Sequence, residues 1–118
     1  MTTEAIAKEL KTLLEEGKFE DIYNTLFHQE KVKHIEPQSL HFPELVGVKA
    51  IKEKDTVMTG NIEEVTSLEI GDYVTSKNFI AIPYKISLTL KNGDERALDE
   101  LIIYQVEEGK IILEQFFY

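Results

Sequence analysis

The sequence predicts an α+β domain in which a curved antiparallel sheet wraps round three helices from the first half of the chain. Apolar residues recur at helical spacing in the first part of the chain, whereas apolar and polar residues alternate in the second. Turn signals divide the alternating part into neighbouring strands. Because the helices are the only elements that can cover the apolar face of this sheet, we expect a cone-shaped core that encloses a cavity.

The first two helices are expected to pack as a hairpin. The first helix carries its apolar residues at helical spacing: Ile6, Leu10, Leu13 and Leu14. Thr2 or Thr3 is its expected N-cap, and Gly17 stands where a helix often ends. After a short turn the second helix repeats the same spacing: Phe19, Ile22, Tyr23 and Leu26.

A short strand and a third helix complete the first half. The strand, residues 32–35, is expected to stop before Pro37, because the residue that precedes a proline avoids helical dihedral angles. A loop follows it up to the third helix, which spans residues 48 to about 58. Ile51 and Val57 are the expected inward positions of that helix.

The stretch NFIAIPYKISLTL is the clearest strand of the second half. Its alternate apolar residues share one face: Ile80, Ile82, Tyr84, Ile86, Leu88 and Leu90. Proline cannot donate to a β-ladder, so Pro83 indicates an edge position or a bulge. Residues 62–75, which precede this strand, are expected to supply one or two less regular strands.

Two turns connect the remaining strands. Asn92-Gly93 predicts a type I′ turn, which needs positive φ at both positions, leading into a strand over residues 95–106. Glu108-Gly109 marks the turn into the last strand, residues 110–118. The second half therefore reads as an antiparallel meander.

The composition of the chain excludes several classes of partner and site. The 118 residues carry a net charge of −9 with scattered basic residues, which disfavours nucleic acid and anionic lipid as partners. No apolar run is long enough to span a bilayer, and the N-terminal segment lacks a secretion signal, so a cytoplasmic protein is expected. The absence of cysteine excludes thiolate metal sites and disulfides. No linker or repeat divides residues 1–118, which are interpreted as a single domain.

Four local stretches carry a resemblance to a known superfamily: EGKFEDIYNTLF, HIEP, FPELVGVKAI and VEEGKIILEQFFY. Their order and spacing resemble the nuclear transport factor 2-like (cystatin-like) superfamily, and in particular its SnoaL-like polyketide cyclases and ketosteroid isomerases. The resemblance covers essentially the whole chain. It implies a cone-shaped fold with a pocket, and sheet-to-sheet homodimers.

The resemblance places Glu36 at the position of the base in the ketosteroid isomerases. The residues that match the surrounding motif are Pro37, Pro43, Gly47, Ala50 and Ile51. The two groups that stabilise the oxyanion in those enzymes have no counterpart, because their positions hold Leu10 and Ile102. Loss of one such donor costs roughly 100-fold or more in rate. Steroid isomerisation is therefore rejected as the leading interpretation.

Strand parity indicates which other residues face the pocket. With Ile102 facing inward, Glu100 and Tyr104 share its face. The resemblance implies a matching set on the last strand: Ile112, Glu114, Phe116 and Tyr118. Carboxyl groups in such apolar surroundings suit general acid or base chemistry, but the same groups in solvent would have no special role.

Tyr23 and His34 have structural as well as functional interpretations. Tyr23 either points its hydroxyl into the cavity or belongs to the core. His34 lies two residues before Glu36, so the two form a conceivable proton-transfer pair, and the alternative is a histidine with one backbone hydrogen bond. The spacing of His28, His34 and His41 matches no common metal motif, so neither metal nor other cofactor is expected.

Two functions from different classes remain. The first is a protein that binds a small, moderately apolar molecule and acts on it by cofactor-free isomerase, cyclase or dehydratase chemistry through Glu36. The second is a non-catalytic dimeric module for ligand binding or protein interaction. In both, the Ile/Leu-rich strands and the EQFFY terminus provide an outer sheet face for a homodimer.

Overall fold

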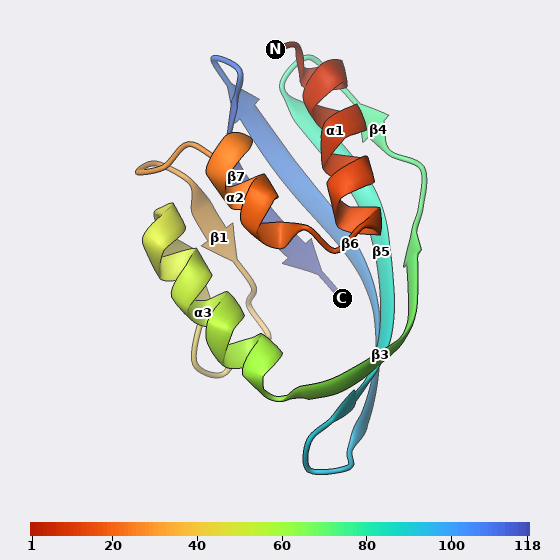
Figure 1. Ribbon diagram of the computed structural model, residues 1–118. Helices are drawn as coiled ribbons and strands as arrows, with labels where there is room; N and C mark the ends of the chain where they lie inside the picture. The colour runs from red at the N-terminus through yellow and green to blue at the C-terminus, as the bar shows by residue number, and fades with distance from the viewer.

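The computed structural model describes residues 1–118. Three helices lie on the inner side of the sheet (Figure 1): α1 (Thr3–Glu15), α2 (Phe19–Thr25) and α3 (Val48–Gly60). Thr2 is the N-cap of α1, because the Ala5 N–H donates to its hydroxyl at 3.1 Å. Gly17 adopts a φ of +67° just beyond the helix end. The predicted helical hairpin is confirmed.

The strands form one open, curved sheet: β1 (Lys33–Ile35), β2 (Glu44–Val46), β3 (Ile62–Ile70), β4 (Val74–Thr75), β5 (Phe79–Leu90), β6 (Glu95–Glu107) and β7 (Lys110–Phe117). Their order is β2-β1-β7-β6-β5-β3, with β4 also paired to β5. The sheet is mixed and not wholly antiparallel as expected, because β1 runs parallel to β7. Strand β2 occupies part of the predicted loop, and it pairs with β1 in antiparallel orientation.

The β5–β6 turn differs from the prediction, whereas the predicted turn at Glu108-Gly109 is confirmed. At the β5–β6 turn only Gly93 has positive φ, and the Gly93 N–H donates to the Leu90 carbonyl at 2.9 Å. The Leu90 N–H donates to the Asp94 carbonyl, so three residues form the loop, and the predicted type I′ turn is wrong. The type I′ pattern of two positive φ angles occurs instead at Glu108 and Gly109, at +49° and +77°.

Pro83 lies neither at an edge nor in a bulge. Strand β5 is flanked by β6 on one side and by β3 and β4 in succession on the other. Pro83 falls in the gap between these two, where its carbonyl accepts the Gly71 N–H at 3.0 Å. The proline nitrogen, which carries no hydrogen, faces that gap, so its lack of an N–H costs the sheet no hydrogen bond. A Cβ at Gly71 would lie 2.8 Å from the proline ring, which explains the glycine there.

A bulge in β7 changes which isoleucine faces inward. The register shifts between Gln105 and Val106, so that Val106 pairs with Ile111. Ile111 is therefore fully buried and Ile112 is only partly buried, contrary to the predicted inward set. Glu114 and Phe116, beyond the bulge, keep the predicted face.

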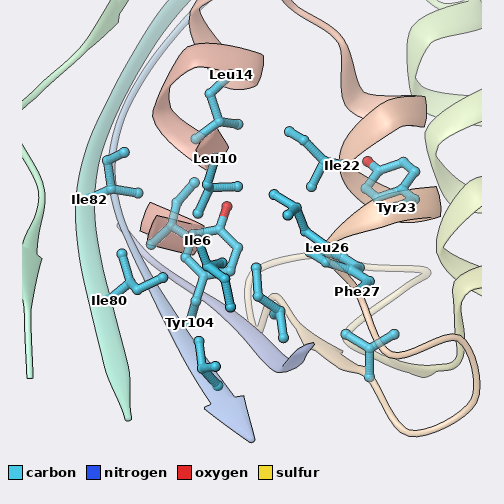
Figure 2. Close-up of a cluster of buried hydrophobic side chains, with 14 of the residues drawn as sticks. Ile6, Leu10, Leu14, Ile22, Tyr23, Leu26, Phe27, Ile80, Ile82 and Tyr104 are labelled. Carbon is cyan, nitrogen blue, oxygen red and sulfur yellow. The ribbon is translucent and has the colours of Figure 1, made fainter. Parts of the chain in front are cut away.

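The main core lies between α1, α2 and the upper part of the sheet (Figure 2). It joins residues from helices and strands: Ile6, Leu10, Leu14, Ile22, Leu26, Phe27, Ile80, Ile82 and Tyr104. Helix α1 contacts β3, β4 and β5, and closes this end of the cone. The other end, between α3 and the curved strands, is less completely filled. None of the three helices combines the length and the apolarity needed to cross a bilayer.

Candidate functional site

A cavity of about 280 Å³ lies between α2, α3 and the concave face of the sheet. Fourteen of its 21 lining residues are hydrophobic, so most of its wall is apolar. The polar residues come mainly from β1, α3, β6 and β7. The cavity thus combines an apolar wall with a group of ionisable side chains.

Helix α3 presents one stripe of side chains to the cavity. Its members recur at spacings of three and four: Ile51, Lys54, Asp55, Met58 and Thr59. Val57 lies off this stripe and its residue is 51% exposed, so the prediction that it faces inward was wrong. The confirmed inward residue of the pair is Ile51.

The sheet contributes side chains in cross-strand rows. In the deepest row Tyr104 pairs with Glu114, which in turn lies beside His34 on β1. The next row places Ile102 opposite Phe116, and the third places Glu100 opposite Tyr84. Because neighbours in a row lie about 5 Å apart, the ionisable groups of β1, β6 and β7 meet in one corner of the cavity.

Four side chains in that corner form one continuous hydrogen-bonded chain. Glu114 Oε1 lies 2.8 Å from His34 Nδ1, and His34 Nε2 lies 2.8 Å from Lys54 Nζ. Lys54 Nζ also donates to Glu36 Oε2 at 3.0 Å. Strands β1 and β7, helix α3 and the segment after β1 are thereby tied together.

The direction of each hydrogen bond follows from the chemistry of lysine. An ammonium group has only donors, so His34 Nε2 accepts from Lys54 and carries no hydrogen. His34 is then neutral, with its hydrogen on Nδ1, which donates to the Glu114 carboxylate. Lys54 is only 6% exposed, and its charge is matched by the partly exposed carboxylate of Glu36.

Glu100 differs from Glu36 and Glu114 because it has no hydrogen-bonding or ion-pair partner. Burial raises its pKa to about 7, and the charges of Glu36 and Glu114 add to the shift, against the opposing effect of Lys54. Its residue is only 6% exposed. An unpaired carboxylate therefore lines the cavity and changes its charge near neutral pH.

The tyrosines of the cavity are held in the neutral form. Burial raises the pKa of Tyr84 to about 12, with further contributions from Glu100, Glu114 and Asp55. Burial also raises the pKa of Tyr23 and of Tyr104 above the usual value. The Tyr104 hydroxyl is fully buried and makes no hydrogen bond, although Glu114 lies in the neighbouring strand position.

The structure brings most of the predicted site residues to the cavity wall: Glu36, Tyr23, His34, Glu100, Ile102, Tyr104, Glu114 and Phe116. Leu10 was expected to line the pocket, because the resemblance places it at an oxyanion-donor position, and this expectation is wrong: it is fully buried in the main core and does not line the cavity. Only the last turn of α1, at Leu14, reaches the cavity. The structure pairs His34 with Glu114 and Lys54, and gives no direct bond between His34 and Glu36.

Lys54 is the principal residue that sequence reasoning missed. Its signal was available, because it falls three residues after Ile51 on the inward stripe of α3. A lysine at such a position needs buried acceptors, and its two acceptors come from the segment that ends β1. No group of three or more His, Asp or Glu side chains is arranged to hold a metal ion.

A family model for the SnoaL-like domain matches residues 1–118. The chain belongs to the SnoaL-like domain family. A search of the curated proteins found no significant match to this SnoaL-like domain.

Solved structures support the same fold for this SnoaL-like domain. A protein from Mesorhizobium loti named as a SnoaL-like polyketide cyclase is 25% identical, with 100% of both chains covered and a TM-score of 0.92. A protein with a cystatin-like fold from Xanthomonas campestris is 21% identical, with 99% of this chain and 90% of that chain covered and a TM-score of 0.77.

A third similar structure has a ketosteroid isomerase-like fold. It is a protein from Catenulispora acidiphila in complex with trimethylamine, 14% identical, with 83% of this chain and 79% of that chain covered and a TM-score of 0.68. The fold names of these structures agree with the predicted superfamily.

Proposed function

We propose that this SnoaL-like domain binds a small, moderately apolar molecule in its cavity and acts on it by cofactor-free acid/base chemistry, with Glu36 as the base. The chemistry is of the isomerase, cyclase or dehydratase kind, in which a proton moves at a carbon next to a carbonyl group. The Mesorhizobium loti protein is named as a SnoaL-like polyketide cyclase, and that name supports this class.

The observation that carries the proposal is the position of Glu36 on an otherwise apolar cavity, paired with Lys54. The Lys54 ammonium group lies 3.0 Å from the Glu36 carboxylate and holds it in a fixed position on the cavity wall. The Glu36 side chain remains 17% exposed, so that a bound molecule can reach it. Lys54 is itself fixed by His34 and Glu114, which orients the carboxylate.

The Glu36→Gln variant tests the chemistry. We expect the wild-type protein to accelerate hydrogen–deuterium exchange at the carbon next to the carbonyl of 2-tetralone in D₂O, and the variant to lose roughly 100-fold or more of that rate. Proton NMR follows the exchange. Binding of 2-tetralone should change little, because the amide keeps the shape of the side chain.

Glu30→Gln is the matched control, since Glu30 is exposed and its side chain makes no ion pair. It should exchange at the wild-type rate. A fully active Glu36→Gln variant, or a wild-type protein without activity on the bound ketone, would contradict the role of Glu36 and favour the non-catalytic binding module.

We also propose that the convex sheet face pairs with a second copy of the chain. Apolar side chains gather there across four strands: Val74, Phe79, Ala81, Leu101, Ile103 and Phe117. Leu101 and Phe117 are neighbours in the register and both are exposed.

Light scattering at micromolar concentration should therefore give twice the chain mass of 13.6 kDa. Leu101→Lys should shift the protein toward the monomer, because it places a charge at the centre of the face, whereas Lys49→Glu on the exposed side of α3 should not. A wild-type protein that remains strictly monomeric would refute the dimer.

A further inference from the structure

We propose that the molecule bound in the cavity is an organic cation, a small amine whose ammonium group pairs with Glu100. This inference rests on the proposed function, because it requires that the cavity holds a ligand. It adds the chemical class of that ligand and assigns Glu100 as its anchoring residue. Glu36 retains its separate role as the base.

The charges of the cavity favour a cation over an anion. Apart from tyrosines, six ionisable side chains line it: His34, Glu36, Lys54, Asp55, Glu100 and Glu114. The hydrogen bonds make His34 neutral, so the one ammonium group of Lys54 faces four carboxyl groups. In a mostly apolar enclosure this excess of acid is weakly screened, and an anionic ligand would be repelled.

Glu100 is the carboxylate that is free to bind a ligand. Glu36 already accepts from Lys54, and Glu114 from His34, whereas Glu100 has neither a hydrogen bond nor an ion pair. A buried carboxylate without a partner is unfavourable, and a bound ammonium group would remove that cost. Asp55 lies on the facing stripe of α3, where burial and the charge of Glu114 raise its pKa.

Two aromatic residues of the cavity wall lie near Glu100, an arrangement that suits an amine. Tyr84 lies directly opposite Glu100 in the β5–β6 register, and Phe116 lies in the adjoining row. Burial is the main cause that raises the pKa of Tyr118 to about 12, and the charges of Glu36 and then Glu100 add to the shift. A carboxylate beside aromatic rings binds ammonium groups through both the ion pair and the ring faces.

Tyr104 marks the deep end of the cavity wall. It has no exposed surface and belongs to the main core, so its hydroxyl is not offered to a ligand. Tyr104 lies four residues from Glu100 on the same face, about 13 Å along the strand, with Ile102 between them. The wall beyond Glu100 is therefore apolar, and it suits the hydrocarbon part of an amine.

A metal ion fits this cavity less well than an amine. No three His, Asp or Glu side chains converge on one point, as a metal site requires. An ammonium group needs only one carboxylate and tolerates apolar surroundings on its other sides. The dispersed acids and the aromatic wall therefore indicate an organic cation.

Isothermal titration calorimetry with three probes of one shape tests the inference: 2-phenylethylamine, 2-phenylethanol and phenylacetate, which are cationic, neutral and anionic. At about pH 8 the amine should bind the wild-type protein at least about tenfold more tightly than the alcohol, and phenylacetate should bind most weakly. Glu100→Gln should reduce the affinity for the amine to that for the alcohol and leave the alcohol unaffected.

Asp99→Asn is the matched control. It removes the same charge from the neighbouring residue of β6, which is exposed on the opposite face, so binding of the amine should persist. The affinity of the wild-type protein for the amine should also rise about tenfold from pH 6 to pH 8, as Glu100 loses its proton, and Glu100→Gln should remove this dependence. Glu36, Lys54, Asp55 and Glu114 remain in place in that variant.

The titrations distinguish a failure of the cation assignment from a failure of the proposed ligand site. Alcohol or phenylacetate that binds as tightly as the amine, or an amine affinity unchanged in Glu100→Gln, overturns the cation assignment and leaves the binding function intact. If none of the three probes binds at millimolar concentration, the proposed ligand site is itself contradicted, and the inference with it.

Discussion

Replacing Lys54 with methionine should lower the free energy of unfolding by about 3 kcal/mol at neutral pH. The substitution keeps the length of the side chain but leaves Glu36 without its counter-ion and His34 Nε2 without a donor. It also removes the only positive charge beside Glu36, Glu100 and Glu114, so the repulsion among these acids increases. Urea unfolding followed by circular dichroism measures the change.

The matched control is Lys49→Met, which removes an exposed lysine from the same helix and should change stability by less than about 0.5 kcal/mol. The double variant Lys54→Met/Glu36→Gln should be more stable than the sum of the single changes predicts, because the two groups interact directly. A Lys54→Met protein as stable as wild type would show that the buried chain of hydrogen bonds does not hold the fold together.

Replacing Glu100 with glutamine should stabilise the ligand-free protein at alkaline pH by about 2 kcal/mol, allowing for partial screening by solvent. Burial raises the pKa of Glu100 from 4.5 to about 7, so the folded protein holds a proton that the unfolded chain releases. Stability from this group is therefore fully present below about pH 4.5 and is lost as the pH rises through about 7.

Urea unfolding of the variant and of wild type at about pH 4.5 and about pH 8.5 tests the sign of this pH dependence. The measured quantity is the difference in unfolding free energy between the two proteins at each pH. The two proteins should be nearly equal at the acid end and the variant should be more stable at the alkaline end. A difference that is the same at both values would mean that Glu100 is not desolvated. A stabilising change that weakens amine binding is the trade-off expected of a binding residue.

Local patterns were enough to predict most helices and strands. The spacing of Ile6, Leu10 and Leu14 predicted α1, and the alternation from Ile80 to Leu90 predicted β5 with its inward face. Both signals depend on residues within one element. Strand β2 escaped prediction because its three residues become a strand only by pairing with β1, and β1 itself pairs in parallel with the distant β7.

The site was predictable where strand parity governs it and unpredictable where long-range pairing does. The resemblance placed Ile102 on the inward face of β6, alternation then added Glu100 and Tyr104, and all three are among the residues that line the cavity. The bulge that turns Ile111 inward in place of Ile112 depends on the register between β6 and β7, which the sequence of β7 alone does not give. The role of Lys54 depends on His34 and Glu36, which lie in another segment of the chain.

The central claim is that the cavity accepts an apolar molecule beside its ionisable corner, and NMR of the isoleucine δ1-methyl groups tests it most directly. With 2-phenylethanol as the probe, we expect saturable shifts for the methyl groups that line the cavity: Ile51, Ile62, Ile86 and Ile102. The methyl groups of the separate core should stay in place: Ile6, Ile22 and Ile111. Shifts confined to Ile103 on the convex face, or no shifts at all, would contradict the claim.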